Sequence, residues 1–173
     1  MSAALHPNIG GNLWKMHVVR LFYWMHFMAS VLVPFYRDWG HISYTQIFTL
    51  NAWFMFCNFL LEVPTGTVAD VFGRKTSLIL GCFTAVAGWL TYSSTPDFRV
   101  FLVGEVLLAT SMTLISGADE ALIYDTLDHL GRRNEAQRIF GRLESSKLAG
   151  IIVGALAGGF IATSFGLRAP MLA

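Results

Sequence analysis

Charged residues are scarce in this sequence, and it lacks features typical of soluble and nucleic-acid-binding proteins. Only 13 % of the 173 residues are charged, about half of the share in a typical soluble domain. The formal net charge of +1 provides no excess of basic residues that would attract nucleic acid. The two cysteines lie within apolar segments, so they do not indicate a disulfide framework.

The sequence also lacks the patterns of metal sites and catalytic sites. Its five histidines show no ligand spacing such as His-x-x-x-His, and we find no constellation of nucleophile and base. We therefore expect no metal, no cofactor and no enzymatic activity. A membrane-embedded enzyme is the remote alternative.

Five long apolar segments are present instead, and 54 % of all residues are hydrophobic. Each segment is close to the ~20 residues that a helix needs to cross ~30 Å of hydrocarbon. Lipid offers the backbone no hydrogen-bond partner, which favours helices. A soluble protein with five such buried helices would have too few polar residues left to cover them. We predict an all-helical integral membrane protein with about five transmembrane helices and the start of a sixth after Arg168. The segments cover residues 21–36, 42–61, 76–96, 100–118 and 148–167.

The distribution of lysine and arginine predicts the orientation in the membrane. If the five segments cross alternately, nine of the 12 basic residues fall on one side. Basic residues are retained in the cytoplasm, so we expect a cytoplasmic amino-terminal segment over residues 1–17. No small-x-small cleavage site follows the first apolar segment, which we expect to remain as the first helix. The nine residues are Lys15, Arg20, Arg74, Lys75, Arg132, Arg133, Arg138, Arg142 and Lys147.

Residues 125–147 form a long polar segment in which acidic and basic residues alternate. We predict a cytoplasmic loop over about 125–147 that contains a short amphipathic helix. A surface for anionic lipid headgroups is the weaker alternative, because Asp128, Glu135 and Glu144 dilute the positive charge there.

A charged loop between the second and third apolar segments carries the most specific pattern. Residues 66–75 match G-x-x-x-D-x-x-G-R-[RK] at every fixed position. Its second glycine can adopt the positive φ that a tight turn requires, and its first would let a neighbouring helix approach closely. A helical hairpin often holds a glycine and a few charges, but the full pattern is much more demanding. The matching residues are Gly66, Asp70, Gly73, Arg74 and Lys75.

This loop resembles the signature between the second and third helices of the major facilitator superfamily. Residues 62–66 and 116–125 also resemble bacterial members, and the likeness covers nearly the whole chain. The resemblance implies a latch on the cytoplasmic side, in which Asp70 and Arg74 join Asp125. It implies a location in the inner (plasma) membrane and twelve helices in two halves. Residues 18–173 would then be the amino-terminal half, and the chain a fragment or natural truncation that needs a carboxy-terminal half.

The fifth apolar segment carries a second pattern of the same superfamily. Its glycines follow the antiporter signature G-x8-G-x3-G-P-x-x-G-G, except that Ala155 replaces the proline. Three of them fall on one helical face and form two small-xxx-small units, which favour close helix contact. Helix packing explains these glycines as well as antiport does, so both interpretations stay open. The five glycines are Gly141, Gly150, Gly154, Gly158 and Gly159.

Polar residues within the apolar segments mark a candidate cavity. Ionisable groups at membrane depth are costly, so they usually have a function. Helical spacing places the candidates on one face of each segment, and His26 shares its face with Tyr23 and Ser30. A hydrogen-bonded structural role is the alternative for each of them. The candidates are His26, Asn51, Asn58, Glu62, Glu105 and Asp119.

These observations together predict a secondary transporter that works by alternating access. Its partners would be the lipid bilayer and a small-molecule substrate, with protons as a possible coupling ion through Glu105 or His26. Many proton-coupled relatives carry an arginine in the fourth helix with the spacing R-x-x-x-G, which Arg99 and Gly104 do not match. Proton coupling, substrate identity and the choice between uptake and efflux therefore stay open. A non-transporting membrane scaffold with the same fold is the rival interpretation.

Overall fold

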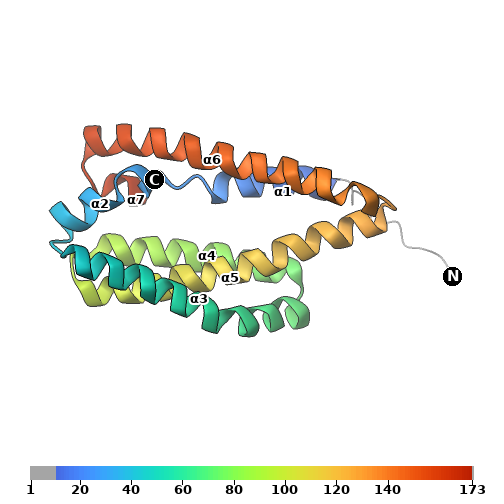
Figure 1. Cartoon of the computed structure of the whole chain (residues 1–173), viewed down its shortest axis with the longest axis horizontal. Helices are drawn as coiled ribbons and strands as arrows, with labels where there is room; N and C mark the ends of the chain where they lie inside the picture. Colours follow the sequence, from blue (N-terminus) through green and yellow to red (C-terminus); the bar gives the residue numbers. More distant parts are fainter. Residues whose placement is uncertain (1–10, 173) are drawn as a thin grey trace.

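A computed structural model describes residues 11–172, which form helices and connecting loops and contain no strand. This confirms the predicted all-helical fold (Figure 1). Short 3₁₀ and π-helical turns are labelled η. The elements are α1 (Gly11–Tyr23), η1 (Phe27–Ser30), α2 (Leu32–Pro34), η2 (Phe35–Trp39), α3 (Tyr44–Phe72), α4 (Arg74–Ser94), α5 (Phe98–His129), η3 (Arg133–Glu135), α6 (Ala136–Phe165) and α7 (Ala169–Leu172).

Four helices, α3 to α6, are each long and apolar enough to cross a membrane. A fifth span results when the bent pair Leu13–Ser30 and Leu32–Trp39 is counted as one. The prediction of about five spans is therefore confirmed. The short helix α7 lies where the start of a sixth was expected.

The first span is broken, whereas a regular helix was predicted there. Helix α1 ends at Tyr23, and a 57° bend follows between the two halves of the span. Pro34 lacks the N–H that a continuous helix would bond to the carbonyl of Ser30, which prevents a regular turn at that point. The prediction that Tyr23, His26 and Ser30 share one helical face is therefore wrong.

The polar segment 125–147 contains no separate amphipathic helix, so that prediction is also wrong. Helix α5 continues to His129 and α6 begins at Ala136, so only a short connection with η3 separates them. Charged residues do not end a helix by themselves, because they can pair along its surface. Gly131, whose φ is 64°, provides the turn after α5.

Helices α3 and α4 both pack against α5, whereas α6 lies beside α1 and η1 in a second layer (Figure 1). Glycines permit the close approach of α4 to α5. A Cβ atom on Gly81 would clash with Ile115, and one on Gly88 would clash with Leu108. The hydroxyl group of Ser77 donates to the carbonyl oxygen of Leu114 at 2.7 Å and thereby joins the two helices.

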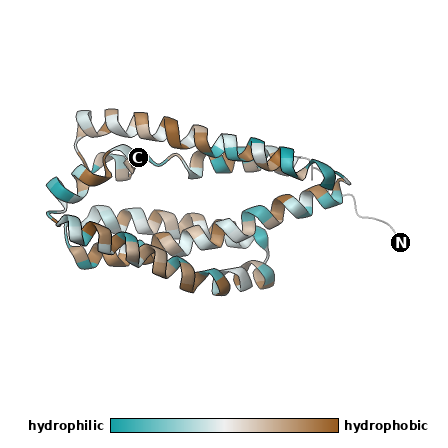
Figure 2. Ribbon diagram, viewed as in Figure 1, coloured by the Kyte–Doolittle hydropathy of each residue, from teal (hydrophilic) through white to brown (hydrophobic). Residues whose placement is uncertain are grey.

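Large apolar side chains cover much of the outer surface of the bundle. Phe59, Val63, Phe83, Leu156 and Phe160 are all at least 70 % exposed. Figure 2 shows the hydrophobic residues along the helices and hydrophilic residues gathered toward the ends of the bundle. Such a surface would be unfavourable in water, whereas it fits contact with lipid tails.

Candidate functional site

Three residues of the predicted latch, Asp70, Arg74 and Asp125, lie together at the turn between α3 and α4. Gly73 separates the two helices with a φ of 89°, a conformation that suits glycine. Arg74 Nη1 lies 2.8 Å from Asp70 Oδ1, and Arg74 Nε lies 3.9 Å from Asp125 Oδ2 on α5. The two aspartate side chains are largely exposed, so each contact contributes about 0–1 kcal/mol. This network can therefore open at little cost.

Two other residues of the loop pattern make no comparable contact. Lys75 forms no salt bridge with any residue in the described range 11–172. A Cβ on Gly66 would meet nothing within 4 Å, so no helix of the described chain approaches it closely. The close approach expected at Gly66 is thus not seen among these helices.

The predicted glycine face of α6 lies against the backbone of the broken first span. A Cβ on Gly150 would clash with Leu21, and one on Gly158 would clash with Phe27. On Gly154 it would lie 2.8 Å from the backbone of His26. A Cβ atom added to the neighbouring Gly159 would lie 3.6 Å from Ser30 Oγ. Close packing therefore accounts for Gly150, Gly154 and Gly158, whereas a side chain at Gly159 would make only an ordinary contact.

The polar stripe of α3 faces away from the packed core of the bundle. Asn51 and Glu62 are exposed, and the side-chain amide of Asn58 donates to the carbonyl oxygen of Phe54 in its own helix at 3.0 Å. None of the three hydrogen-bonds to His26, Glu105 or Asp119 in the described structure. The structure therefore does not gather all predicted cavity residues at one place.

Glu105 lies in a buried chain of hydroxyl groups that the sequence analysis missed. The hydroxyl group of Tyr92 donates to Glu105 Oε1 at 2.5 Å, and that of Tyr36 donates to the Tyr92 oxygen at 3.0 Å. The exposed fractions are 8 % for Glu105, 1 % for Tyr92 and 4 % for Tyr36. The three residues come from α5, α4 and η2. No local pattern in the sequence indicated this contact.

Asp119 is held in a buried ion pair. Arg20 Nε of α1 donates to Asp119 Oδ2 at 2.6 Å, and both residues are buried. Glu144 Oε2 of α6 lies 3.8 Å from Arg20 Nη1. In the sequence, Arg20 indicated only the orientation in the membrane. A buried acid in an apolar segment normally needs a cation nearby, and that requirement was the signal that could have identified Arg20.

His26 packs among aromatic rings at the break of the first span. Its ring stacks on Trp24 with 5.6 Å between centroids, and its edge meets Trp89 at 6.0 Å. Helix packing thus surrounds this residue with apolar surface on two sides. Trp89 belongs to α4, and its ring lies 6.1 Å from that of Tyr92.

Comparisons with known proteins identify the family. A sequence profile of the Major Facilitator Superfamily matches residues 18–173. The chain belongs to this superfamily. It is also 27 % identical over 139 residues to Multidrug resistance protein 2 of Bacillus subtilis (strain 168), covering 80 % of this chain and 34 % of that protein. The chain thus spans about a third of the length of that relative.

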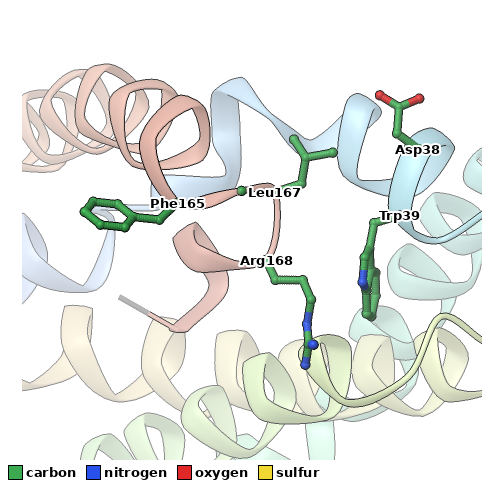
Figure 3. A pocket seen from close by; sticks show the side chains of 6 residues that line it. Asp38, Trp39, Phe165, Leu167 and Arg168 are labelled. Carbon is green, nitrogen blue, oxygen red and sulfur yellow. The ribbon is translucent and has the colours of Figure 1, made fainter.

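As a member of the Major Facilitator Superfamily, the chain comes from a family of membrane transporters. A pocket of about 340 Å³ opens near the junction of α6 and α7, but it contains none of the predicted site residues. In Figure 3 the Arg168 side chain lies beside the Trp39 ring, while the Asp38 carboxylate points away from it. The Arg168 guanidinium carbon lies 5.2 Å from the centroid of that ring. Within the described range, no group of three His, Cys, Asp or Glu side chains could hold a metal ion.

Proposed function

We propose that this chain is the amino-terminal half of a secondary transporter that exports small organic compounds by alternating access. The family match over residues 18–173 carries this proposal. The name of the Bacillus subtilis relative, a multidrug resistance protein, supports drug-like compounds as the substrate class. The carboxy-terminal half would complete the central substrate site. The amino terminus would lie in the cytoplasm, in agreement with the distribution of basic residues.

We further propose that Asp70, Arg74 and Asp125 act as a latch on the cytoplasmic side. Arg74 contacts Asp70 across the α3–α4 loop at 2.8 Å and joins the loop to Asp125 of α5 at 3.9 Å. Because these contacts are exposed and weak, they can shift the balance between inward-facing and outward-facing states without blocking either. They lie apart from the buried polar residues and would not contact the substrate.

Export would be driven by proton exchange, with Glu105 as the proton carrier of this half. The buried acidic residues of the described range are Glu105 and Asp119. Protonation of Asp119 would leave the buried charge of Arg20 without its partner, which is costly. Glu105 forms no salt bridge with the described residues, so its protonation removes a buried charge. His26, the second candidate, is partly buried and packs against the rings of Trp24 and Trp89.

The test uses the full-length transporter in proteoliposomes, with the lipophilic cation ethidium as the probe. A pH gradient should drive ethidium accumulation by the parent protein. Glu105→Gln keeps the shape of the side chain but cannot carry a proton, so it should abolish accumulation against a gradient while downhill exchange continues. Glu120→Gln, at an exposed carboxyl group of the same helix α5, is the matched control and should retain accumulation.

Full accumulation by Glu105→Gln would contradict its assignment as the proton carrier. His26→Gln in the same assay tests the second candidate. If both variants accumulate ethidium normally, the proton would be carried at Glu62, at Asp119 or in the other half. A parent protein that moves no ethidium would contradict the proposed substrate class.

A further inference from the structure

Tyr36, Tyr92 and Glu105 form one continuous hydrogen-bonded chain between three elements of the fold. Tyr36 belongs to η2, directly after the break of the first span, and Tyr92 and Glu105 belong to α4 and α5. We propose that Tyr92, held by Tyr36, is the residue that positions the Glu105 carboxyl group for proton transfer. This inference rests on the proposed role of Glu105 as a proton carrier.

The direction of the hydrogen bonds fixes the role of each hydroxyl group. The hydroxyl group of Tyr36 donates a hydrogen bond to the hydroxyl oxygen of Tyr92. The Tyr92 hydroxyl proton is directed to Glu105 Oε1, at an oxygen–oxygen distance of 2.5 Å. An ionised carboxylate only accepts hydrogen bonds, and a bond to it is roughly twice as strong as one between neutral groups. The chain therefore stabilises the ionised form of Glu105 more than the protonated form.

Packing holds the Tyr92 ring in the orientation that this bond requires. Phe101 stacks on the ring with 5.2 Å between centroids and an interplanar angle of 13°. On the same helix as Phe101, α5, a Cβ atom at Gly104 would lie only 2.5 Å from Cδ2 of Tyr92. The absence of a side chain at Gly104 thus lets the ring lie against α5, one residue before Glu105. Tyr92→Phe would keep these ring contacts and remove only the hydroxyl group.

The other groups around Glu105 leave the two tyrosines as its main polar neighbours. Cys57 of α3 lies near enough to interact with the charge of Glu105. Arg168 donates to the carbonyl oxygen of Ser93, the residue after Tyr92, and forms no salt bridge with Glu105. In the described chain the hydrogen bonds to the Glu105 side chain come from Tyr92. Protonation transfers one proton from a hydronium ion of the aqueous phase to the carboxylate and leaves a water molecule.

This arrangement links the protonation of Glu105 on α5 to the position of the first span. When Glu105 is ionised, the strong bond from Tyr92 is in place, and Tyr36 ties η2 to it. When Glu105 takes up a proton, that bond weakens because its acceptor is no longer charged. The segment after the break is then held less firmly against α4 and α5. Proton uptake would in this way reach the first span through two hydroxyl groups.

The experiment measures the protonation of Glu105 directly and needs no substrate. Infrared spectra of the full-length protein in lipid vesicles are recorded across pH, and the carboxyl band missing from Glu105→Gln is assigned to Glu105. In Tyr92→Phe this band should persist to a pH about one to two units higher than in the parent, because the donor to the carboxylate is lost. Tyr36→Phe should move it in the same direction by less. Tyr44→Phe, an exposed tyrosine whose ring stacks on Arg37, is the matched control and should change nothing.

Coincident titration curves for the parent and Tyr92→Phe would overturn the inference, as would a Glu105 band that appears at no pH. If Tyr92→Phe fails to fold, Tyr36→Phe still decides, because it removes only the outer hydroxyl group of the chain. A different result is expected if Glu105 is not the proton carrier. In that case Glu105→Gln would accumulate ethidium normally, while the infrared curves of the tyrosine variants would still separate.

Discussion

Arg20 and Asp119 place two opposite charges between α1 and α5 in the interior of the bundle. Their contact of 2.6 Å joins the two layers of the fold, and Glu144 of α6 lies next to it. Asp119 Oδ1 is buried and has no hydrogen-bond partner among the described residues. A buried pair of this kind gives little net stability, but it makes each charge dependent on the other.

Arg20→Ala should destabilise the full-length protein by about 3–5 kcal/mol, because it leaves the Asp119 charge buried without a partner. The double variant Arg20→Met/Asp119→Leu removes both charges and should recover most of this loss. Thermal unfolding in detergent measures both effects. Arg132→Ala, which breaks an exposed pair with Glu135, is the control and should change stability by about 0–1 kcal/mol. If Arg20→Ala is as stable as Arg132→Ala, the buried pair of Arg20 and Asp119 is not formed.

At the scale of elements, the contact between α6 and the first span depends on glycine. The backbone of residues 21–27 lies where side chains on α6 would otherwise be. Gly141 belongs to the same signature as Gly158, yet a Cβ on Gly141 would meet nothing within 4 Å. The same sequence pattern therefore contains Gly158, which a close helix contact requires, and Gly141, whose surroundings are open.

Gly158→Ala should lower the stability of the bundle, because its methyl group would clash with the backbone of Phe27 and the two elements would have to separate. Gly141→Ala should be neutral or stabilising by about 0.5–1 kcal/mol, since alanine is the better helix former at an open position. Thermal unfolding of the two matched variants in the same detergent checks this contrast. Equal effects at both positions would contradict the close contact between α6 and the first span.

The sequence predicted those elements whose signal is local. Helices α3 to α6 follow from hydropathy, because each apolar segment must satisfy its own backbone within lipid. The Gly73 turn followed from a motif that needs positive φ. Pro34 is a local signal for the bend of the first span. The end of the helix at Tyr23 was missed because the residues that follow lie against the glycines of α6, a contact between distant segments. The Tyr36–Tyr92–Glu105 chain was missed for the same reason.

Continuation of a helix past the membrane was misjudged on different grounds. The polarity of residues 125–147 predicted a loop with a short amphipathic helix. Polarity, however, decides whether a segment enters lipid, not whether it is helical. Helix α5 therefore runs on to His129, and the turn comes only where Gly131 permits it. Buried ion pairs such as that of Arg20 also lay beyond a pattern analysis that treats each segment alone.

At the scale of the whole molecule, the proposed orientation can be tested with cysteine labelling. The native residues Cys57 and Cys82 are first replaced by alanine. Single cysteines at the exposed positions Ser94 and Gly131 should then react with a membrane-impermeant maleimide from opposite sides of the cell membrane. The basic loops place Gly131 in the cytoplasm and Ser94 outside. Labelling of both from the same side would contradict the five-span topology.

Helix α5 contacts α3 and α4 on one side and α1 on the other. Its Asp125 contacts Arg74 at the α3–α4 loop, and its Asp119 contacts Arg20 of α1. Dissolved salt should affect these two contacts differently. Mobile ions screen charges beyond about 8 Å at physiological ionic strength and weaken exposed pairs first. The Arg74–Asp125 contact is open to them, whereas Arg20 and Asp119 are enclosed. A rise in the ionic strength of the surrounding solution would therefore loosen the attachment of α5 to the α3–α4 loop and leave its attachment to α1 intact.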